Sequence, residues 1–109
     1  MIRVFIRHSV ANYAQWRVVY DEFDQERQQM GVLEEAVYQE LEDPNAITVT
    51  HDFADAETAR AFVASDRLRE VMAEAGVVDA PQVWSTQAAW AIPRGLWPHY
   101  WGHEYNFPG

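Results

Sequence analysis

The amino-acid sequence predicts an α+β domain with a four-stranded antiparallel sheet whose helices cover only one face. Apolar residues alternate in residues 47–53, which is typical of a strand. In residues 13–30 they recur every three or four positions, which is typical of a helix. The predicted elements follow the order strand, helix, strand, strand, helix, strand. This is the ferredoxin-like βαββαβ order.

The first half of the chain begins with a strand and a long helix. Ile2–His8 is the first predicted strand. Asn12 and Gln15 form a capping-box pattern, so the helix is expected to cover Tyr13–Met30. Gly31 is placed to end that helix in a left-handed conformation. Its buried side is predicted to consist of Tyr13, Trp16, Tyr20, Phe23, Arg27 and Met30.

A hairpin follows the helix. Leu33–Leu41 is the second predicted strand and Ile47–Phe53 the third. Between them, Pro44 presets the backbone for the second position of a turn, so Glu42–Asn45 is expected to reverse the chain.

The second half closes the fold with two short helices and a last strand. Asp55 is expected to cap a helix over Ala56–Ala64. A recapped helix follows Ser65 and ends at Gly76. Pro81 opens the last strand, which we expect to cover Gln82–Ala91.

The composition excludes several classes of protein. The chain has 109 residues and a net charge of −9, from 17 acidic and 8 basic residues. This balance disfavours nucleic acid and anionic membrane surfaces as partners. The absence of cysteine removes disulfide scaffolds and thiolate chemistry. No signal-like or membrane-spanning apolar run is apparent, so we expect a soluble cytoplasmic protein.

One face of the predicted sheet has no helix to cover it. Phe5, Tyr38 and Trp84 or Trp90 are expected on that face. An uncovered aromatic patch of this size is rare on a monomer. We therefore expect a second copy to pack sheet against sheet, giving a homodimer with a cavity between the sheets.

The end of the chain has a different character. We divide the sequence into a ferredoxin-like domain, residues 1–91, and an aromatic-rich extension, residues 92–109, which is expected to pack on the body or on the partner subunit. His99 and His103 would lie one turn apart on a helix and are candidate metal ligands. Pro98 and Gly102 disfavour such a helix, so no metal site is expected.

The chain contains a series of short motifs: Trp16 and Arg27 before Gly31, the turn Leu41–Asn45, Thr50–Phe53, Ala59–Phe62, Ser65, Leu68, Met72, Ala75–Val77 and Pro81. These motifs resemble those of one family, the antibiotic biosynthesis monooxygenase-like group of the dimeric α+β barrel superfamily. The resemblance covers approximately residues 2–91 and implies the dimeric barrel fold. Members include oxygenases that act without a cofactor on polyphenolic or quinone-like substrates, haem-degrading enzymes and proteins of no known activity.

Two histidines are the first candidate catalytic residues. His8 and His51 share parity with the aliphatic residues of their strands and lie near the ends of those strands. We expect the first and third strands to be parallel neighbours, which would bring the two imidazoles together as a pair that transfers protons. The alternative is a structural role, with both histidines satisfied by backbone carbonyls and by carboxylates such as Asp52.

A second group of residues lies on the uncovered face. An aromatic wall with hydroxyls and one guanidinium suits a planar, partly polar ligand, and Arg7 is the candidate stabiliser of an anionic intermediate. The alternative is a simply packed dimer interface in which Arg7 pairs with Glu40. The predicted ligand-binding residues, besides Arg7, are Phe5, Tyr38, Thr48, Thr50 and Trp84.

These observations predict a homodimer that binds a small hydrophobic or aromatic molecule. The favoured activity is cofactor-independent monooxygenation of an aromatic or polyketide-like substrate, with His51 or His8 as the base. Two alternatives remain: a non-catalytic ligand-binding or stress-related dimer, and an interaction module that uses its aromatic extension.

Overall fold

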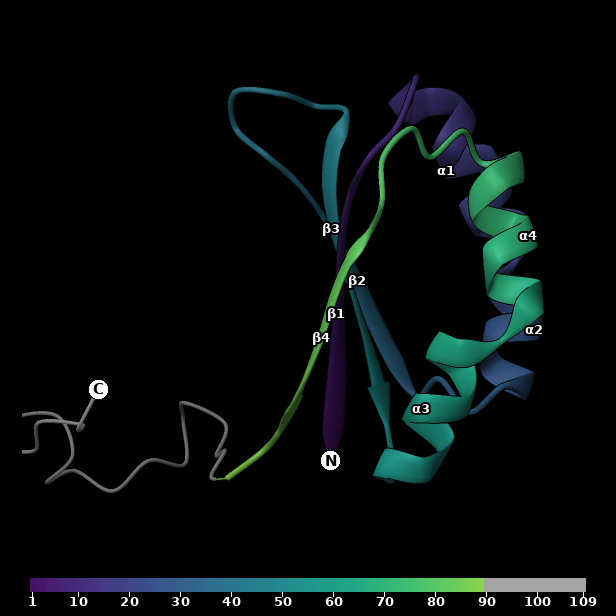
Figure 1. Ribbon diagram of the computed structural model, residues 1–109, viewed down its shortest axis with the longest axis vertical. Helices are drawn as coiled ribbons and strands as arrows, with labels where there is room; N and C mark the ends of the chain where they lie inside the picture. Colours follow the sequence, from purple (N-terminus) through teal and green to yellow (C-terminus); the bar gives the residue numbers. More distant parts are fainter. Residues whose placement is uncertain (90–109) are drawn as a thin grey trace, which may run out of the picture.

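The computed structural model describes residues 1–89 (Figure 1). The elements are, in chain order, β1 (Ile2–Ser9), α1 (Tyr13–Glu22), α2 (Asp24–Gln29), β2 (Glu34–Gln39), β3 (Ala46–Phe53), α3 (Ala56–Ala64), α4 (Asp66–Glu74) and β4 (Gln82–Gln87).

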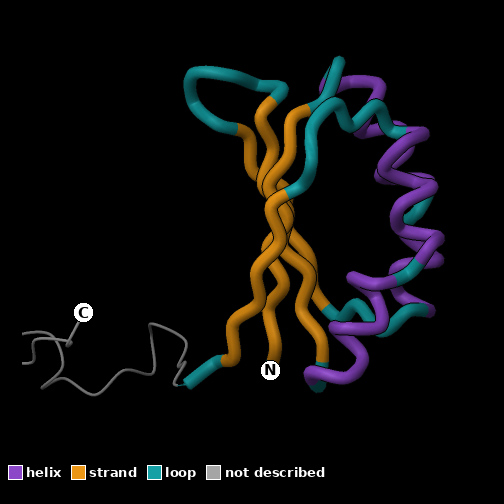
Figure 2. The backbone as a smooth tube through the Cα atoms, viewed as in Figure 1, coloured by secondary structure: helices purple, strands orange, loops and turns teal. Residues whose placement is uncertain are grey.

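The strands form one four-stranded sheet in the order β2-β3-β1-β4, and every neighbouring pair is antiparallel. All four helices lie on the same side of this twisted sheet (Figure 2), and no described element covers the other side. The predicted ferredoxin-like α+β fold is therefore confirmed. Among residues 1–89, no helix is long and apolar enough to cross a lipid bilayer.

The relation between β1 and β3 corrects the sequence prediction. The two strands are neighbours, but they run antiparallel, with Val4 opposite His51 and His8 opposite Ile47. The helical crossover makes β2 parallel to β1, and the hairpin then reverses the chain into β3. Strand β3 therefore runs opposite to β1, and the carboxyl termini of these two strands lie at opposite ends of the sheet.

The first helical region follows the predicted signals but consists of two helices. The Asn12 side chain accepts a hydrogen bond from the Gln15 amide at 3.0 Å, which caps α1 as predicted. Phe23 separates α1 from α2, so the single helix predicted over residues 13–30 is interrupted at that residue. Gly31 adopts a φ of +99°, the left-handed conformation expected at the end of the region.

The hairpin forms where the sequence predicted it, but β2 is shorter. The Ala46 amide bonds to the Asp43 carbonyl at 3.0 Å, which places Pro44 at the second position of the turn. Leu41, expected in the strand, lies outside it and is fully exposed. Asn45 connects this turn to the start of α1: its side chain accepts from the Tyr13 amide and its carbonyl from the Val10 amide, both at 2.9 Å.

The second half follows the prediction closely. The Asp55 side chain caps α3 through the Thr58 amide at 2.8 Å, and Ser65 caps α4. Strand β4 ends at Gln87, within the predicted range. Trp90 and the extension at 92–109, with its two histidines, lie outside the described residues.

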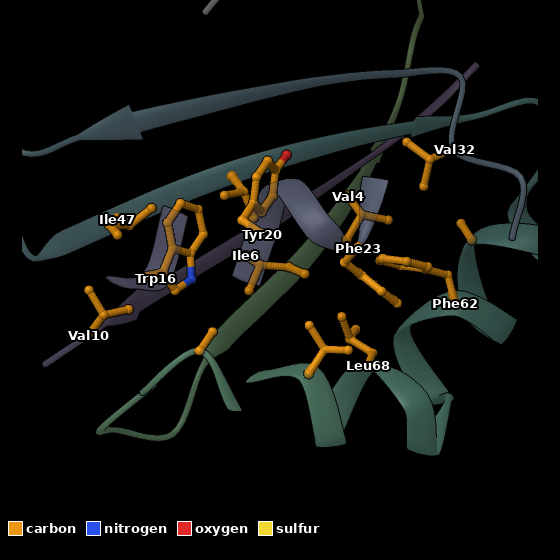
Figure 3. Close-up of a cluster of buried hydrophobic side chains, with 14 of the residues drawn as sticks. Val4, Ile6, Val10, Trp16, Tyr20, Phe23, Val32, Ile47, Phe62 and Leu68 are labelled. Carbon is orange, nitrogen blue, oxygen red and sulfur yellow. The ribbon is translucent and has the colours of Figure 1, made fainter. Parts of the chain in front are cut away.

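The hydrophobic core lies between the sheet and the helices (Figure 3). The odd-numbered residues of β3 and the even-numbered residues of β1 supply its sheet side, and α1 and α4 supply much of its helix side. Its fully buried members include Val4, Ile6, Ile47, Phe53 and Phe62, with exposures of 0–1%.

Candidate functional site

Two buried imidazoles project from the sheet toward the helices. His8 and His51 are 3% and 2% exposed, and both lie on the helix-facing side of the sheet, as their strand parity predicted. The register separates them by four residues along the strands, about 13 Å at 3.3 Å per residue. They therefore do not contact each other directly, although both border the same cavity.

Neither imidazole has a hydrogen-bond partner within residues 1–89. Both ring nitrogens of His8 and both of His51 are buried without one. The structural alternative expected the imidazoles to donate hydrogen bonds to backbone carbonyls or to Asp52. The Asp52 carboxylate instead accepts from Arg3 at 2.7 and 2.9 Å. Buried polar atoms without partners are rare in native proteins because each costs free energy. These four nitrogens therefore mark both histidines as candidate functional residues.

Burial keeps both imidazoles in their neutral form. Desolvation, together with a smaller contribution from the nearby Arg27 cation, lowers the pKa of His51 to about 4. Desolvation also lowers the pKa of His8, although the Asp79 carboxylate partly offsets this. At neutral pH each histidine accordingly has one nitrogen able to accept a proton.

A cavity of about 40 Å³ lies between the sheet and the helices, beside both histidines. The labelled side chains of Ile6, Trp16, Tyr20 and Leu68 gather around this region in Figure 3. Trp16 and Tyr20 stack with ring centroids 4.8 Å apart and form one wall. The full lining is Ile6, His8, Trp16, Tyr20, Phe23, Arg27, Val49, His51, Leu68, Val71, Met72 and Ala75.

Arg27 is a site residue to which the sequence prediction gave no chemical role. It is 2% exposed and lines the cavity. Its Nε and Nη2 donate to the two carboxylate oxygens of Glu35, both at 2.9 Å, and its Nη1 donates to the Tyr20 carbonyl at 2.5 Å. The guanidinium also lies 3.7 Å from the centre of the Tyr20 ring. An arginine among the apolar positions of a helix was the signal available in the sequence.

The partner carboxylate and the tyrosine complete the polar part of the site. Burial alone would raise the pKa of Glu35, but the hydrogen bonds and charge of Arg27 lower it overall. Glu35 lies directly across from His51 in the β2–β3 register. The Tyr20 hydroxyl is buried without a hydrogen-bond partner among residues 1–89, and burial raises its pKa. The site thus holds a neutral phenol, neutral imidazoles and one paired cation.

The predicted ligand-binding residues lie on the opposite, open face of the sheet. Phe5 and Trp84 stack there in parallel, with ring centroids 5.2 Å apart, and Tyr38 lies opposite Thr48 in the register. Thr50 is opposite Phe5. The structure therefore gathers this group as predicted.

Arg7 belongs to the same open face. Its Nε donates to a Glu40 carboxylate oxygen at 2.9 Å and its Nη2 donates to the same oxygen. This is the pairing that the alternative interpretation expected. The sheet separates Arg7 from the histidines, so the three candidate catalytic residues do not share a cavity within one subunit.

Within residues 1–89, no three or more histidine, aspartate or glutamate side chains gather in a way that could hold a metal ion. The pair His99 and His103 lies outside the described residues.

Comparisons with known proteins place this geometry in a structural group. The chain matches no protein-family sequence model, and curated proteins give no sequence match. A proposed antibiotic biosynthesis monooxygenase from Deinococcus radiodurans superposes with a TM-score of 0.68 at 18% identity, covering 85% of this chain and 97% of that one. The chain has the antibiotic biosynthesis monooxygenase fold.

Two further structures share this fold. SnoaB, a cofactor-independent oxygenase from Streptomyces nogalater, gives a TM-score of 0.69 at 13% identity and covers 84% of this chain and 96% of its own. A conserved protein from Methanosarcina mazei Go1 gives 0.65 at 20% identity, covering 79% and 90%. At these low identities it is the TM-scores that establish a common fold.

Proposed function

We propose that this protein is a cytoplasmic homodimer that binds a small aromatic or polyketide-like molecule and oxidises it with dioxygen, without a cofactor. The observation that carries the proposal is the pair of neutral, unpartnered imidazoles beside an apolar cavity. The monooxygenase fold, shared with a cofactor-independent oxygenase, supports it.

In this proposal His51 is the general base. A neutral imidazole nitrogen removes a proton from an acidic CH₂ group of the substrate, and the resulting carbanion reduces dioxygen directly. Coupling of the two radicals gives a peroxide. Loss of water then leaves a carbonyl group, so that the CH₂ group and one O₂ become C=O and H₂O. Arg27 borders the same cavity, and although its N–H groups donate to Glu35 and to the Tyr20 carbonyl, its charge would contribute to stabilising the anionic intermediate.

The size of the cavity determines how a substrate enters. The cavity holds about 40 Å³, whereas pockets for organic ligands typically have volumes of roughly 300–1,000 Å³. A ring can therefore bind only if a lining side chain moves. Met72 is partly buried, unbranched and flexible, so we propose that it is the side chain that yields.

Replacing His51 with glutamine tests the proposed base. We expect turnover to fall by about 10²–10⁴-fold, the usual contribution of a positioned general base. Oxygen consumption with a dihydroxyanthrone as substrate measures this, corrected for oxidation in buffer alone. Unchanged turnover in a folded His51→Gln protein would exclude His51 as the base.

An Arg7→Gln variant decides which face of the sheet carries the chemistry. Arg7 is held by Glu40 on the open face, on the other side of the sheet from both histidines. Retained turnover supports a reaction on the helix side. Loss of turnover in the folded variant would return the reaction to the open face and to the anion-stabilising role first predicted for Arg7.

The open face is proposed as the surface on which the second copy packs. Trp84 is 44% exposed, Tyr38 is 57% exposed, and no described element covers them. We expect Trp84→Glu to shift the protein to a monomer in sedimentation velocity at micromolar concentration. Val18→Glu, on an exposed position of α1, is the matched control and should remain dimeric. A monomeric wild-type protein would contradict the dimer.

A non-catalytic dimer of the same fold is the second candidate function. Two observations favour it. The cavity is too small for an organic ring, and Arg7 already pairs with Glu40 within the protein. Titration calorimetry with the aromatic probe tests this candidate. A protein that sediments as a dimer but shows no detectable binding of the probe would support the non-catalytic dimer over the oxygenase.

A further inference from the structure

We propose that the cavity beside His51 is a binding site for dioxygen, or more generally for a small apolar gas molecule. Its identity as a dioxygen site rests on the proposed oxygenase function, whereas its capacity to hold an apolar gas rests on the cavity alone. The volume present in the structure would serve the gas, and the organic ring would use the volume opened by Met72.

The size of the cavity selects its guest. A water-sized guest needs roughly 10–15 Å³ of such volume, so a cavity of about 40 Å³ has room for a molecule of two or three heavy atoms. Dioxygen satisfies this limit and a six-membered ring does not. The walls are tightly packed, since Ile6, Val49 and Phe23 are only 1–4% exposed.

The chemistry of the walls disfavours water. A buried water needs two to four polar partners, and apolar cavities stay dry and bind apolar guests. Most of the lining consists of aliphatic or aromatic side chains. The four imidazole nitrogens and the Tyr20 hydroxyl are covered by neighbouring atoms, so the side-chain movement that admits the organic substrate must also uncover the His51 nitrogen. Arg27, the one cation in the lining, directs its hydrogen bonds to Glu35 and to the Tyr20 carbonyl.

The position of the cavity gives it a role. It borders His51, the residue proposed to generate the carbanion. A dry site at this point would hold dioxygen next to the intermediate that reduces it, and would keep water from protonating that intermediate. Among residues 1–89, this is the cavity that adjoins both unpartnered histidines.

Methyl-detected NMR under dioxygen pressure tests the site. Dioxygen is paramagnetic, so we expect a relaxation enhancement of the Leu68, Val71 and Met72 methyl groups several-fold above that of Val4 and Ile47. The latter two are core residues that do not line the cavity, and they are more deeply buried (0% exposed) than Leu68 and Val71 (8% and 7%). Enhancement no larger than in these two controls would overturn the proposal, as would an ordered water found in the cavity of a crystal.

Paired valine-to-isoleucine variants locate the guest. Val71→Ile adds one methylene group to the cavity wall, whereas Val63→Ile makes the same change on α3, outside the lining. We expect Val71→Ile to abolish xenon binding in pressurised crystals and to raise the KM for dioxygen several-fold more than the KM for the organic substrate. Val63→Ile should match the wild type in both measurements.

Xenon binding and the KM for dioxygen together show whether the gas-site proposal or the oxygenase proposal is wrong. Xenon binding by the wild-type protein without turnover of any aromatic probe would retain the gas site and overturn the oxygenase function. Turnover with equal values of KM for dioxygen in the two variants would retain the enzyme and overturn the dioxygen site. If Val71→Ile does not fold, the wild-type xenon and relaxation measurements still decide the presence of the guest.

Discussion

Replacing Arg27 with alanine is expected to lower the free energy of unfolding by about 3 kcal/mol. This is the lower end of the loss expected when a buried ion pair is broken by removing one partner. Arg27 is 2% exposed, and its removal leaves the partly buried Glu35 carboxylate without its two hydrogen bonds. The Tyr20 carbonyl loses a donor and the Tyr20 ring loses its stacked guanidinium. Urea denaturation at pH 7 measures the change.

Two comparisons show whether the ion pair causes this loss. Arg17→Ala removes an exposed pair with Asp21 on α1 and should change the free energy of unfolding by no more than about 0.5 kcal/mol. Arg27→Met with Glu35→Leu replaces the buried pair by apolar groups and should recover much of the lost stability. Equal, small losses for Arg17→Ala and Arg27→Ala would show that the buried pair contributes little.

Lowering the pH from 7 to 4 is expected to reduce the free energy of unfolding by about 3 kcal/mol through His51 alone. Burial lowers the pKa of His51 in the folded protein to about 4, from its ordinary value of 6.5. The unfolded chain therefore binds a proton below pH 6.5 that the folded protein does not bind until about pH 4. Stability is complete above pH 6.5 and is lost as the pH falls through this interval.

A His51→Leu variant isolates this contribution. The charged and titratable groups that act on His51 are Arg27, Glu35, Asp52 and His8. All four remain in the variant, so the difference in pH dependence between variant and wild type belongs to His51. Chemical denaturation at pH 7, 6, 5 and 4 should show a shallower loss in the variant. Parallel curves for the two proteins would mean that His51 is protonated equally in the folded and unfolded states.

The fold was predictable because local signals and long-range pattern agree. The Asn12, Asp55 and Ser65 caps and the left-handed Gly31 mark helix boundaries that the structure confirms. The strand direction was wrong because alternation assigns a residue to a face but says nothing of which way a neighbouring strand runs. The interruption at Phe23 was also missed, since the spacing of buried residues continues unbroken across it.

The site was predictable only in part. Parity placed His8 and His51 on one face and Arg7 on the other, but the sequence-based interpretation combined them in a single mechanism. Arg27 was recognised as buried, whereas its bidentate partner Glu35 is fixed by the tertiary contact between α2 and β2. Cavity volume depends on how twelve side chains from five elements and two helix caps pack, which no periodicity in the sequence encodes.

Asn45 has a consequence for the dynamics of the protein. Its side chain accepts a hydrogen bond from the Tyr13 amide, and its carbonyl accepts one from the Val10 amide. The neighbouring Ala11 amide donates to the Gly76 carbonyl. Three loops at one end of the molecule are therefore bound into a single cooperative unit that opens together or not at all. Deuterium should enter the amides of Val10, Ala11 and Tyr13 at a common rate, and an Asn45→Ala protein should exchange all three faster.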